Sequence, residues 1–417
     1  MAFQQGLSGL NATSKNLSVI GNNIANANTY GAKASRAEFA DMYANAINGS
    51  GGSAIGIGVN LTGVTQRFTQ GNITTTESGL DLAINGNGFF QLESGGATVY
   101  SRNGQFMLDK SGNIVNSSGQ KLLGYAASSD GVIIPSTVQA LQLPTAGVAP
   151  KATESVSLEF NLDSRVAGPD AALTFDPADP TTYNNATSVT VYDAKGQEMA
   201  LTYYFRKSDT VADTWDIYVT ANGTDPFAGA PAVPGVTFAT DGSEITAPVG
   251  GIPLTIPAGV PLTGGGTSLD INFDLHLDNA TQFGAAFSVT DLSQDGYAPG
   301  QLTGVSIDKT GVIKAQYSNG QSKSAGQLVL ATFRNPQGLQ PLGDNRWAQS
   351  PSSGDPITGS PGSSGQYGVL QSSALEDSNV DLTAELVNMI TQQRAYQANA
   401  QTIKTQDSIL QTLVNLR

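Results

Sequence analysis

The sequence predicts a mixed, mainly β fold in which paired, coiled-coil-like N- and C-terminal α-helices join two nested, discontinuous β domains. Three observations predict it: apolar residues recur at heptad spacing at both chain ends, short runs of alternating polarity fill the middle, and one hairpin pattern occurs twice. The composition agrees, because 48 glycines and only 13% charged residues are typical of β-rich surface proteins.

The N-terminal segment, residues 1–28, is predicted to be a helix. Phe3, Leu10, Leu17 and Ile24 fall seven residues apart with Leu7 between them, which is a coiled-coil spacing. Each of its three glycines costs up to about 1 kcal/mol relative to alanine, so the helix is expected to be marginal in isolation. These glycines are Gly6, Gly9 and Gly21.

The C-terminal segment, residues 376–417, is predicted to contain a longer helix, which starts at one of two candidate N-caps and spans about 50 Å. Asn379 and Asp381 are both candidate N-caps. Alternating steps of four and three residues then select a stripe in which eight of ten residues are apolar. The stripe consists of Leu382, Leu386, Met389, Gln393, Tyr396, Ala400, Ile403, Asp407, Leu410 and Val414.

A second apolar stripe makes the arc to be buried wider than one partner helix requires. It consists of Val387, Ile390, Ile409, Leu413 and Leu416. Periodicity alone fits a core helix of an ordinary domain as well as an assembly helix. The position of both helices at the chain ends favours their pairing, and the wide arc favours packing against neighbouring copies. The expected seam residues are Phe3, Leu7, Leu10, Leu17, Ile24, Leu382, Leu386, Met389, Tyr396, Ile403, Leu410 and Val414.

Residues 29–70 are predicted to be a connector segment, because residues 44–60 are rich in Gly, Ser and Asn. Residues 71–146 and 297–375 are predicted to form one inner β domain. Residues 351–365 (PSSGDPITGSPGSSG) are expected to be an exposed loop of it.

A repeated hairpin pattern is the evidence that the inner β domain is discontinuous. Residues 109–112 (DKSG) match residues 308–311 (DKTG), and Gly119-Gln120 matches Gly320-Gln321. Such turns supply the positive-φ glycines that hairpins require. The two hairpins flank an insert, which is therefore expected to loop out of the domain.

The insert, residues 147–296, is predicted to be an acidic outer β domain. It contains nineteen acidic and five basic residues, so it carries the whole net charge of −14. Its candidate strands are VSLEFNL, SVTVYDAKGQEMALTYYFR, TWDIYVT, SLDINFDLHL and AAFSVTDL, and proline-rich stretches at 231–234 and 248–261 are expected to be long loops. A neutral frame with an acidic insert indicates that the frame packs against copies of itself while the insert faces water.

The residue inventory argues against catalysis, metal and cofactor binding. The chain has no cysteine and one histidine, so thiolate sites, His-rich metal sites and nucleophile–base pairs are nearly excluded. His276 falls on the polar face of an alternating run and is expected to be solvated. Residues 49–58 (GSGGSAIGIG) lack the lysine of a phosphate-binding loop. No catalytic, cofactor-binding or metal residues are expected.

The net charge and the hydropathy limit the kinds of partner that the chain can have. A net charge of −14 argues against nucleic acid. No apolar run reaches the ~18 residues of a membrane span, so membrane insertion is not expected. The first basic residue is Lys15 and no apolar run follows it, so export is expected without a cleaved signal peptide.

Three stretches resemble the bacterial rod–hook axial protein family. They are SGLNATSKNLSVIGNNIANANTYGAK (8–33), YSRNGQFMLDKSGNIVNSSGQKLLGY (100–125) and the C-terminal SNVDLTAELVNMITQQRAYQANAQTIKTQDSILQTLVNL. Within that family the chain is more similar to hook subunits than to distal rod proteins. The acidic insert, QDGYAPGQLTGVSIDKTGVIKAQYSNGQ (294–321) and VYDAKGQEMALTYYF (191–205) carry this distinction.

The resemblance implies a self-assembling subunit of a curved, flexible tube that transmits motor torque from rod to filament. It implies terminal helices that line the inner tube, a β shell around them and an outward-facing insert. The implied partners are other copies, distal rod, hook cap and hook–filament junction proteins, and the flagellar type III export apparatus that exports the unfolded chain. The implied location is the extracellular hook of the bacterial flagellum.

Alternatives to this interpretation remain at the level of sequence. One is a distal rod protein of the same family, which the insert argues against. Another is a β-rich surface adhesin or carbohydrate-binding protein, which would need clustered aromatics, whereas Trp215 and Trp347 lie in separate segments. A third is a hydrolase with a convergent acid pair, which sequence cannot reveal.

Overall fold

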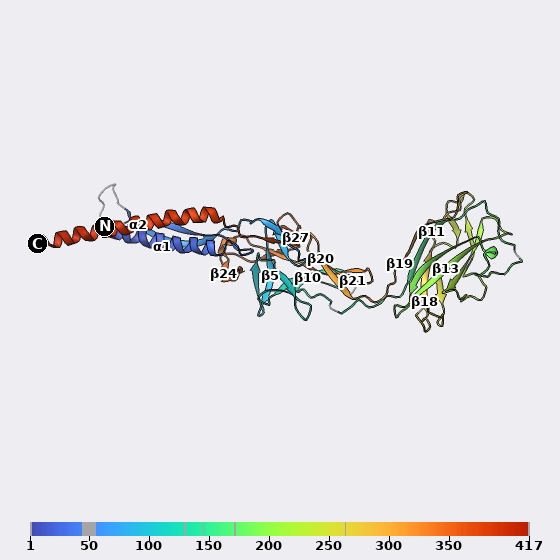
Figure 1. Ribbon diagram of the computed structural model, residues 1–417. Coiled ribbons are helices and arrows are strands. Elements are labelled where there is room, and N and C mark those ends of the chain that lie inside the picture. Colours follow the sequence, from blue (N-terminus) through green and yellow to red (C-terminus); the bar gives the residue numbers. More distant parts are fainter. Residues whose placement is uncertain are drawn as a thin grey trace. The chain divides into compact units, whose positions relative to one another are not determined.

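The structure is a computed structural model that describes residues 2–43, 56–128, 131–144, 146–170, 172–262 and 264–415. The chain forms two compact units (Figure 1). Unit 1 comprises residues 1–145, 303–316 and 322–417, and unit 2 comprises residues 146–302 and 317–321.

Helices form at both chain ends, as the sequence predicts. They are α1 (Ala2–Ala25) and α2 (Leu382–Asn415). Of the two candidate N-caps, Asp381 caps α2, because its Oδ1 accepts the N–H groups of Thr383 (2.9 Å) and Ala384 (3.1 Å). The Asn379 side chain instead donates to the carbonyl of Arg67 (2.8 Å) and so fastens the segment before α2 to the rest of unit 1.

A long antiparallel hairpin occupies the region expected to be a connector. Strand β1 (Ser35–Tyr43) pairs with β2 (Gly56–Gln66), with bulges in the pairing. The glycine-rich sequence pattern did not predict these strands. Residues 44–55, at the centre of the glycine-rich stretch, lie outside the described residues.

The rest of unit 1 is built around a large branched sheet. Its main path runs β20-β21-β22-β9-β5-β6-β25-β24. These strands are β20 (Leu302–Ile307), β21 (Val312–Tyr317), β22 (Ser322–Leu328), β9 (Lys121–Ala127), β5 (Phe89–Ser94), β6 (Ala97–Ser101), β25 (Arg346–Ala348) and β24 (Gln340–Gly343). The side branches are β7 (Phe106–Leu108), β8 (Ile114–Asn116), β10 (Ile133–Ala140), β23 (Leu330–Thr332) and β26 (Ile357–Gly359). Strand β26 lies in the segment predicted to be an exposed loop, where pairing with β23 supplies its backbone hydrogen bonds.

Two short strand pairs connect this domain to the start of α2. Strand β27 (Val369–Ser372) pairs with β4 (Leu82–Asn85), and β28 (Ala374–Glu376) pairs with β3 (Ile73–Thr75). The C-terminal run into α2 is therefore held by strands from early in the chain.

The two matching turns have the same geometry. In the first, Asp109 Oδ1 accepts the N–H groups of Ser111 and Asn113, both at 2.8 Å. In the second, Asp308 Oδ1 accepts those of Thr310 (2.9 Å) and Val312 (3.0 Å). The fourth residue of both turns is a glycine at φ 80°, a conformation that residues with a Cβ rarely adopt. The repeat in the sequence is thus a repeated local structure.

Unit 2 is a β-sandwich of two sheets. One sheet runs β17-β18-β11-β19 and the other β12-β13-β14-β15-β16. The first consists of β17 (Ile252–Ile256), β18 (Ile271–His276), β11 (Ser155–Asn161) and β19 (Ser288–Gln294). The second consists of β12 (Asn185–Tyr192), β13 (Glu198–Lys207), β14 (Thr214–Ala221), β15 (Val233–Phe238) and β16 (Ile245–Ala247). Two 3-10 turns, Pro180–Thr182 in unit 2 and Pro336–Gly338 in unit 1, complete the elements described.

All five strand-rich segments predicted for the insert form strands, but the two proline-rich stretches are not only loops. They contain strand residues of β15 and β17. Pro253 is tolerated because β17 is an edge strand, and Pro234 lies where the pairing of β15 with β14 is bulged. His276 is at the end of β18 and partly exposed, with its Nδ1 3.7 Å from Asp278 Oδ2.

The core of unit 2 is drawn from its own residues. Buried side chains from both sheets form one cluster between Val156 and Ala280, including Trp215. Phe205 lies at its centre with 0% exposure, and its ring centroid is 4.6 Å from that of Phe160. Because none of the residues that the structure describes in unit 1 contributes to this cluster, unit 2 has the requirements of an independent folding domain.

We expect residues 146–302, expressed alone, to fold and to unfold in one cooperative thermal transition. Circular dichroism of the β signal during heating measures it. A matched Phe205→Asp variant, which buries an unpaired charge, should lose the transition. A wild-type fragment that is unfolded at room temperature would contradict the independence of this core.

Candidate assembly interface

The two terminal helices pair antiparallel within one chain. A Cβ placed on Gly6 would lie 3.1 Å from Ile403 Cγ1, and one on Gly9 would lie 2.9 Å from Asn399 Nδ2. Near the other end of α1, Asn23 Nδ2 donates to Glu385 Oε1 at 3.1 Å. Figure 1 shows the two helices side by side. Two of the glycines that weaken α1 are therefore the positions at which α2 approaches its backbone.

The pairing buries only part of the predicted seam. Partly buried within the chain are Leu10, Leu17, Ile24, Met389 and Ile403, while Phe3, Leu7, Leu382, Leu386, Tyr396 and Leu410 are exposed, and Val414 lies in the last turn of α2. The face of α2 that is partly buried also has polar residues such as Gln392 and Asn399. The Asn399 side chain packs directly against the backbone of α1, because the residue that faces it, Gly9, has no side chain.

An apolar surface is left uncovered on α2. Near the start of the helix, Leu386, Val387 and Ile390 are 44%, 58% and 52% exposed. Further along, Tyr396, Ile409 and Leu410 are exposed as well. Large apolar side chains that stay exposed on one helix make it a candidate docking surface.

The β1–β2 hairpin is fastened to α1 by two reciprocal hydrogen-bond pairs. The Ser8 hydroxyl donates to the Val59 carbonyl (2.6 Å) and accepts the Val59 N–H (2.8 Å). The Asn23 side chain donates to the Ser35 carbonyl and accepts its N–H, both at 2.8 Å. The hairpin is thus a third layer of the helical region, which the glycine-rich sequence gave no reason to expect.

A buried ion triad fastens the base of the helix pair to the β domain. Glu376 Oε1 lies 2.6 Å from Lys33 Nζ, and Glu376 Oε2 lies 3.0 Å from Arg102 Nη1. The Glu376 side chain is 0% exposed, and it also accepts the Gly71 N–H at 3.0 Å. Burial lowers the pKa of the Lys33 ammonium, and the Glu376 carboxylate opposes this effect. Three distant parts of the chain therefore meet at one charged, hydrogen-bonded point.

The triad could not be found from sequence, because Lys33 and Arg102 are 343 and 274 residues from Glu376. All three lie in or beside stretches that resemble the axial family, but that resemblance assigns them no role. The only physical signal is the scarcity of charge in this part of the chain.

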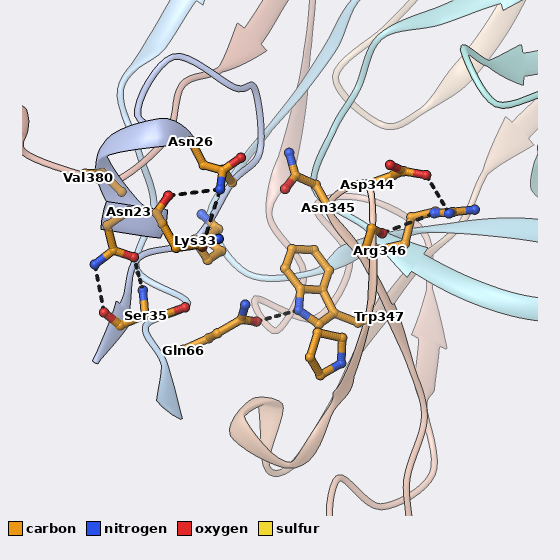
Figure 2. Close-up of a pocket in the computed structure, with 14 residues that line it drawn as sticks. Asn23, Asn26, Lys33, Ser35, Gln66, Asp344, Asn345, Arg346, Trp347 and Val380 are labelled. Atoms are coloured by element: carbon orange, nitrogen blue, oxygen red, sulfur yellow. Dashed lines mark hydrogen bonds and ion pairs between the residues drawn. The ribbon is translucent and has the colours of Figure 1, made fainter. Parts of the chain in front are cut away.

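A polar pocket of about 320 Å³ has Lys33, one member of the triad, in its lining (Figure 2). Trp347 Nε1 donates to Gln66 Oε1 at 2.6 Å, and Arg346 pairs with Asp344 at 2.7 Å. Asn345 donates to the Tyr30 carbonyl at 2.9 Å. The bonds of Trp347 and Asn345 join β2 and the segment that follows α1 to the β24–β25 hairpin, so the pocket lies where these elements of unit 1 meet.

Within the described part of the chain, no group of three His, Asp or Glu residues could hold a metal ion. None of its helices is long and apolar enough to span a membrane.

The chain is similar over its full length to known flagellar hook proteins. Flagellar hook protein FlgE of Salmonella typhimurium is 43% identical over 424 residues, covering 100% of both chains. That of Escherichia coli is 42% identical over 424 residues, again covering 100% of both. That of Borreliella burgdorferi is 33% identical and covers 100% of this chain and 99% of its own.

Four domain families match successive parts of the chain. The flagella basal body rod protein family matches residues 3–33, and the flagellar hook protein FlgE/F/G D1 domain matches residues 83–149. The flagellar basal body protein FlaE D2 domain matches residues 161–297, and the flagellar basal body rod FlgEFG protein C-terminal family matches residues 371–416.

The fold is also similar to a solved structure, that of Helicobacter pylori flagellar hook protein FlgE2. The TM-score is 0.51 at 15% identity, and the match covers 73% of this chain and 100% of the other. At this identity the similarity concerns the fold alone.

We expect Glu376→Ala to destabilise unit 1 by about 3–5 kcal/mol, because two buried cations lose their counter-ion. Chemical denaturation monitored by the fluorescence of Trp347, in a Trp215→Phe background, measures the loss. As a control, Glu77→Ala removes an exposed carboxylate and should change stability by less than about 0.5 kcal/mol. Equal stabilities of the two variants would show that the triad is not a fastening point.

Proposed function

The chain belongs to the flagellar hook protein family, and we propose that its paired terminal helices carry the assembly of the hook. The chain is a structural subunit of the hook, the curved, flexible tube that transmits motor torque from the rod to the filament. Full-length similarity to hook proteins carries this conclusion.

The observation that supports the helices as the assembly surface is their uncovered apolar surface. Pairing with α1 leaves Leu386, Val387 and Ile390 about half exposed. Each of these side chains is already about half buried, so covering the exposed half contributes roughly half of the 1.5–3 kcal/mol of full burial. In a polymer the partner is a neighbouring copy, so each copy covers the uncovered apolar surface of another.

The remaining chain is proposed to surround this helical core. Residues 1–28 and 376–417 form the tube core, and the β1–β2 hairpin within residues 29–70 packs on its α1 side. Residues 71–146 and 297–375 form the inner β domain, and residues 147–296 form the outer domain. The charge distribution supports this order, because a segment that carries −14 is more stable facing water than packed against its own copies.

The further partners and the route of export are inferences from the family. The chain contacts distal rod, hook cap and hook–filament junction proteins, and the flagellar type III apparatus exports it unfolded, without a cleaved signal peptide. Its final location is the extracellular hook between basal body and filament. Its role is mechanical, with no reaction catalysed.

We expect Leu386→Asp to abolish tube formation while leaving the isolated chain folded. Leu386 is exposed in one copy, so its replacement should change monomer stability by no more than about 0.5 kcal/mol. In the polymer it would place an unpaired charge in an apolar contact. Electron microscopy of concentrated protein, in which the wild type should form tubes, measures assembly.

Gln397→Glu is the matched control for Leu386→Asp, because it adds the same charge at an exposed polar position of α2. It should still form tubes. Normal tubes from Leu386→Asp would show that the uncovered stripe does not contact neighbouring copies.

We expect deletion of the acidic insert to spare the tube and to change its curvature. Val148 and Gly300 exchange both backbone hydrogen bonds (2.8 and 3.2 Å), so a two-residue turn can join the chain across residues 149–299. Repulsion between outer domains is screened over ~8 Å at physiological ionic strength, so the curvature of wild-type tubes should depend on salt. Electron microscopy at low and high salt measures it.

A charge-only control separates repulsion from bulk in this experiment. Asp209→Asn, Asp278→Asn and Asp291→Asn together remove exposed charge and keep the domain. They should shift curvature in the same direction as high salt. An insert-deleted chain that forms no tubes would make the insert essential scaffold, and unaltered curvature at every salt concentration would make it passive cover.

A further inference from the structure

The last two turns of α2 extend beyond the start of α1. Gly9 lies opposite Asn399 and Gly6 opposite Ile403, so at this register Ala2 faces about residue 406. Residues 407–415 therefore have no part of α1 beside them, which Figure 1 also shows at the C-terminal end of the helix. Ile409 and Leu410 in this overhang are 48% and 54% exposed.

A groove of about 630 Å³ lies between α1 and β2 on the same unit. It follows α1 from Gln4 to Lys15, and its apolar lining includes Leu7, Val59 and Leu61. The overhang cannot occupy this groove in its own chain, because a straight helix leads it away from α1.

We propose that the overhang of α2 (residues 407–415) binds in the α1–β2 groove of a second copy of this chain. This inference rests on the proposed assembly function. The lengths agree: the overhang covers nine residues and the groove twelve positions of α1, about 13.5 and 18 Å at 1.5 Å per residue. If the midpoint of the overhang lies level with the midpoint of the groove, the second copy is displaced from the first by about 18 Å along the helix axis.

The same displacement brings complementary side chains level. Asp407, exposed at the start of the overhang, comes within about 3 Å, measured along the axis, of the level of Lys15 at the end of the groove. Leu410 comes level with residues 10–11 of α1, between Leu7 and Lys15. Apolar and charged groups thus coincide in one arrangement.

The contact joins two different surfaces of the same chain. Each copy offers its overhang to one neighbour and its groove to another, so the contact propagates instead of closing into a dimer. Such a contact extends a tube.

Disulfide cross-linking tests the contact directly, because the chain has no cysteine of its own. Chains with Asn11→Cys and chains with Leu410→Cys are mixed, assembled into tubes and oxidised. A disulfide requires Cα atoms within about 7 Å, so only adjacent positions link. We expect a dimer in the mixture, none from either single variant, and a ladder of multimers when both substitutions are in one chain.

The arms of this experiment separate the possible outcomes. Val387→Cys mixed with Asn11→Cys is the control and should give no dimer. A dimer from this control would mean that another segment occupies the groove. A dimer from Leu410→Cys alone would mean that the overhang binds another surface, and either result would overturn the proposal. Asp407→Cys with Lys15→Cys repeats the test if Leu410→Cys does not assemble. Intact tubes without any cross-link would contradict this contact alone, whereas a wild-type chain that forms no tubes would contradict the proposed function.

Discussion

The buried carboxylate of Glu376 is the constraint on which the rest of unit 1 depends. It accepts hydrogen bonds from Lys33, Arg102 and the Gly71 N–H, and its backbone carbonyl accepts the Gly31 N–H at 2.8 Å. A buried charge is tolerated only when it is paired and hydrogen-bonded, so these segments must come together for the fold to be stable. The segment that leaves α1, the β domain and the approach to α2 are thereby fixed at one point.

From this point the two helices run as a pair whose surface is covered by the rest of the chain on one side only. The glycines of α1 allow α2 to approach closely, and the β1–β2 hairpin covers another face of α1 through Ser8 and Asn23. The apolar surface around Val387 and Ile390 remains open. A single chain thus leaves an apolar helix surface uncovered, and the proposed assembly covers that surface with copies of the same chain.

The sequence predicted features that depend on local spacing, and it missed those that depend on distant contacts. Both helices and the strands of the insert follow from periodicity, and the repeated turns follow from Asp109 and Asp308 with their glycines. The β1–β2 hairpin was missed because its sequence is rich in small and polar residues. The heptad pattern selected Leu386 for the helix seam because it is large and apolar. The residues of α2 that pack against α1 instead include polar ones such as Asn399, because Gly9 leaves room for it.

A helical reconstruction of the assembled tube by electron cryomicroscopy tests the central claim most directly. The account predicts that α1 and α2 keep their antiparallel register, with Gly9 against Asn399, and that Leu386, Val387 and Ile390 are buried against neighbouring copies. A map in which these three side chains face the channel or the solvent, or in which the two helices of one chain separate, would contradict it.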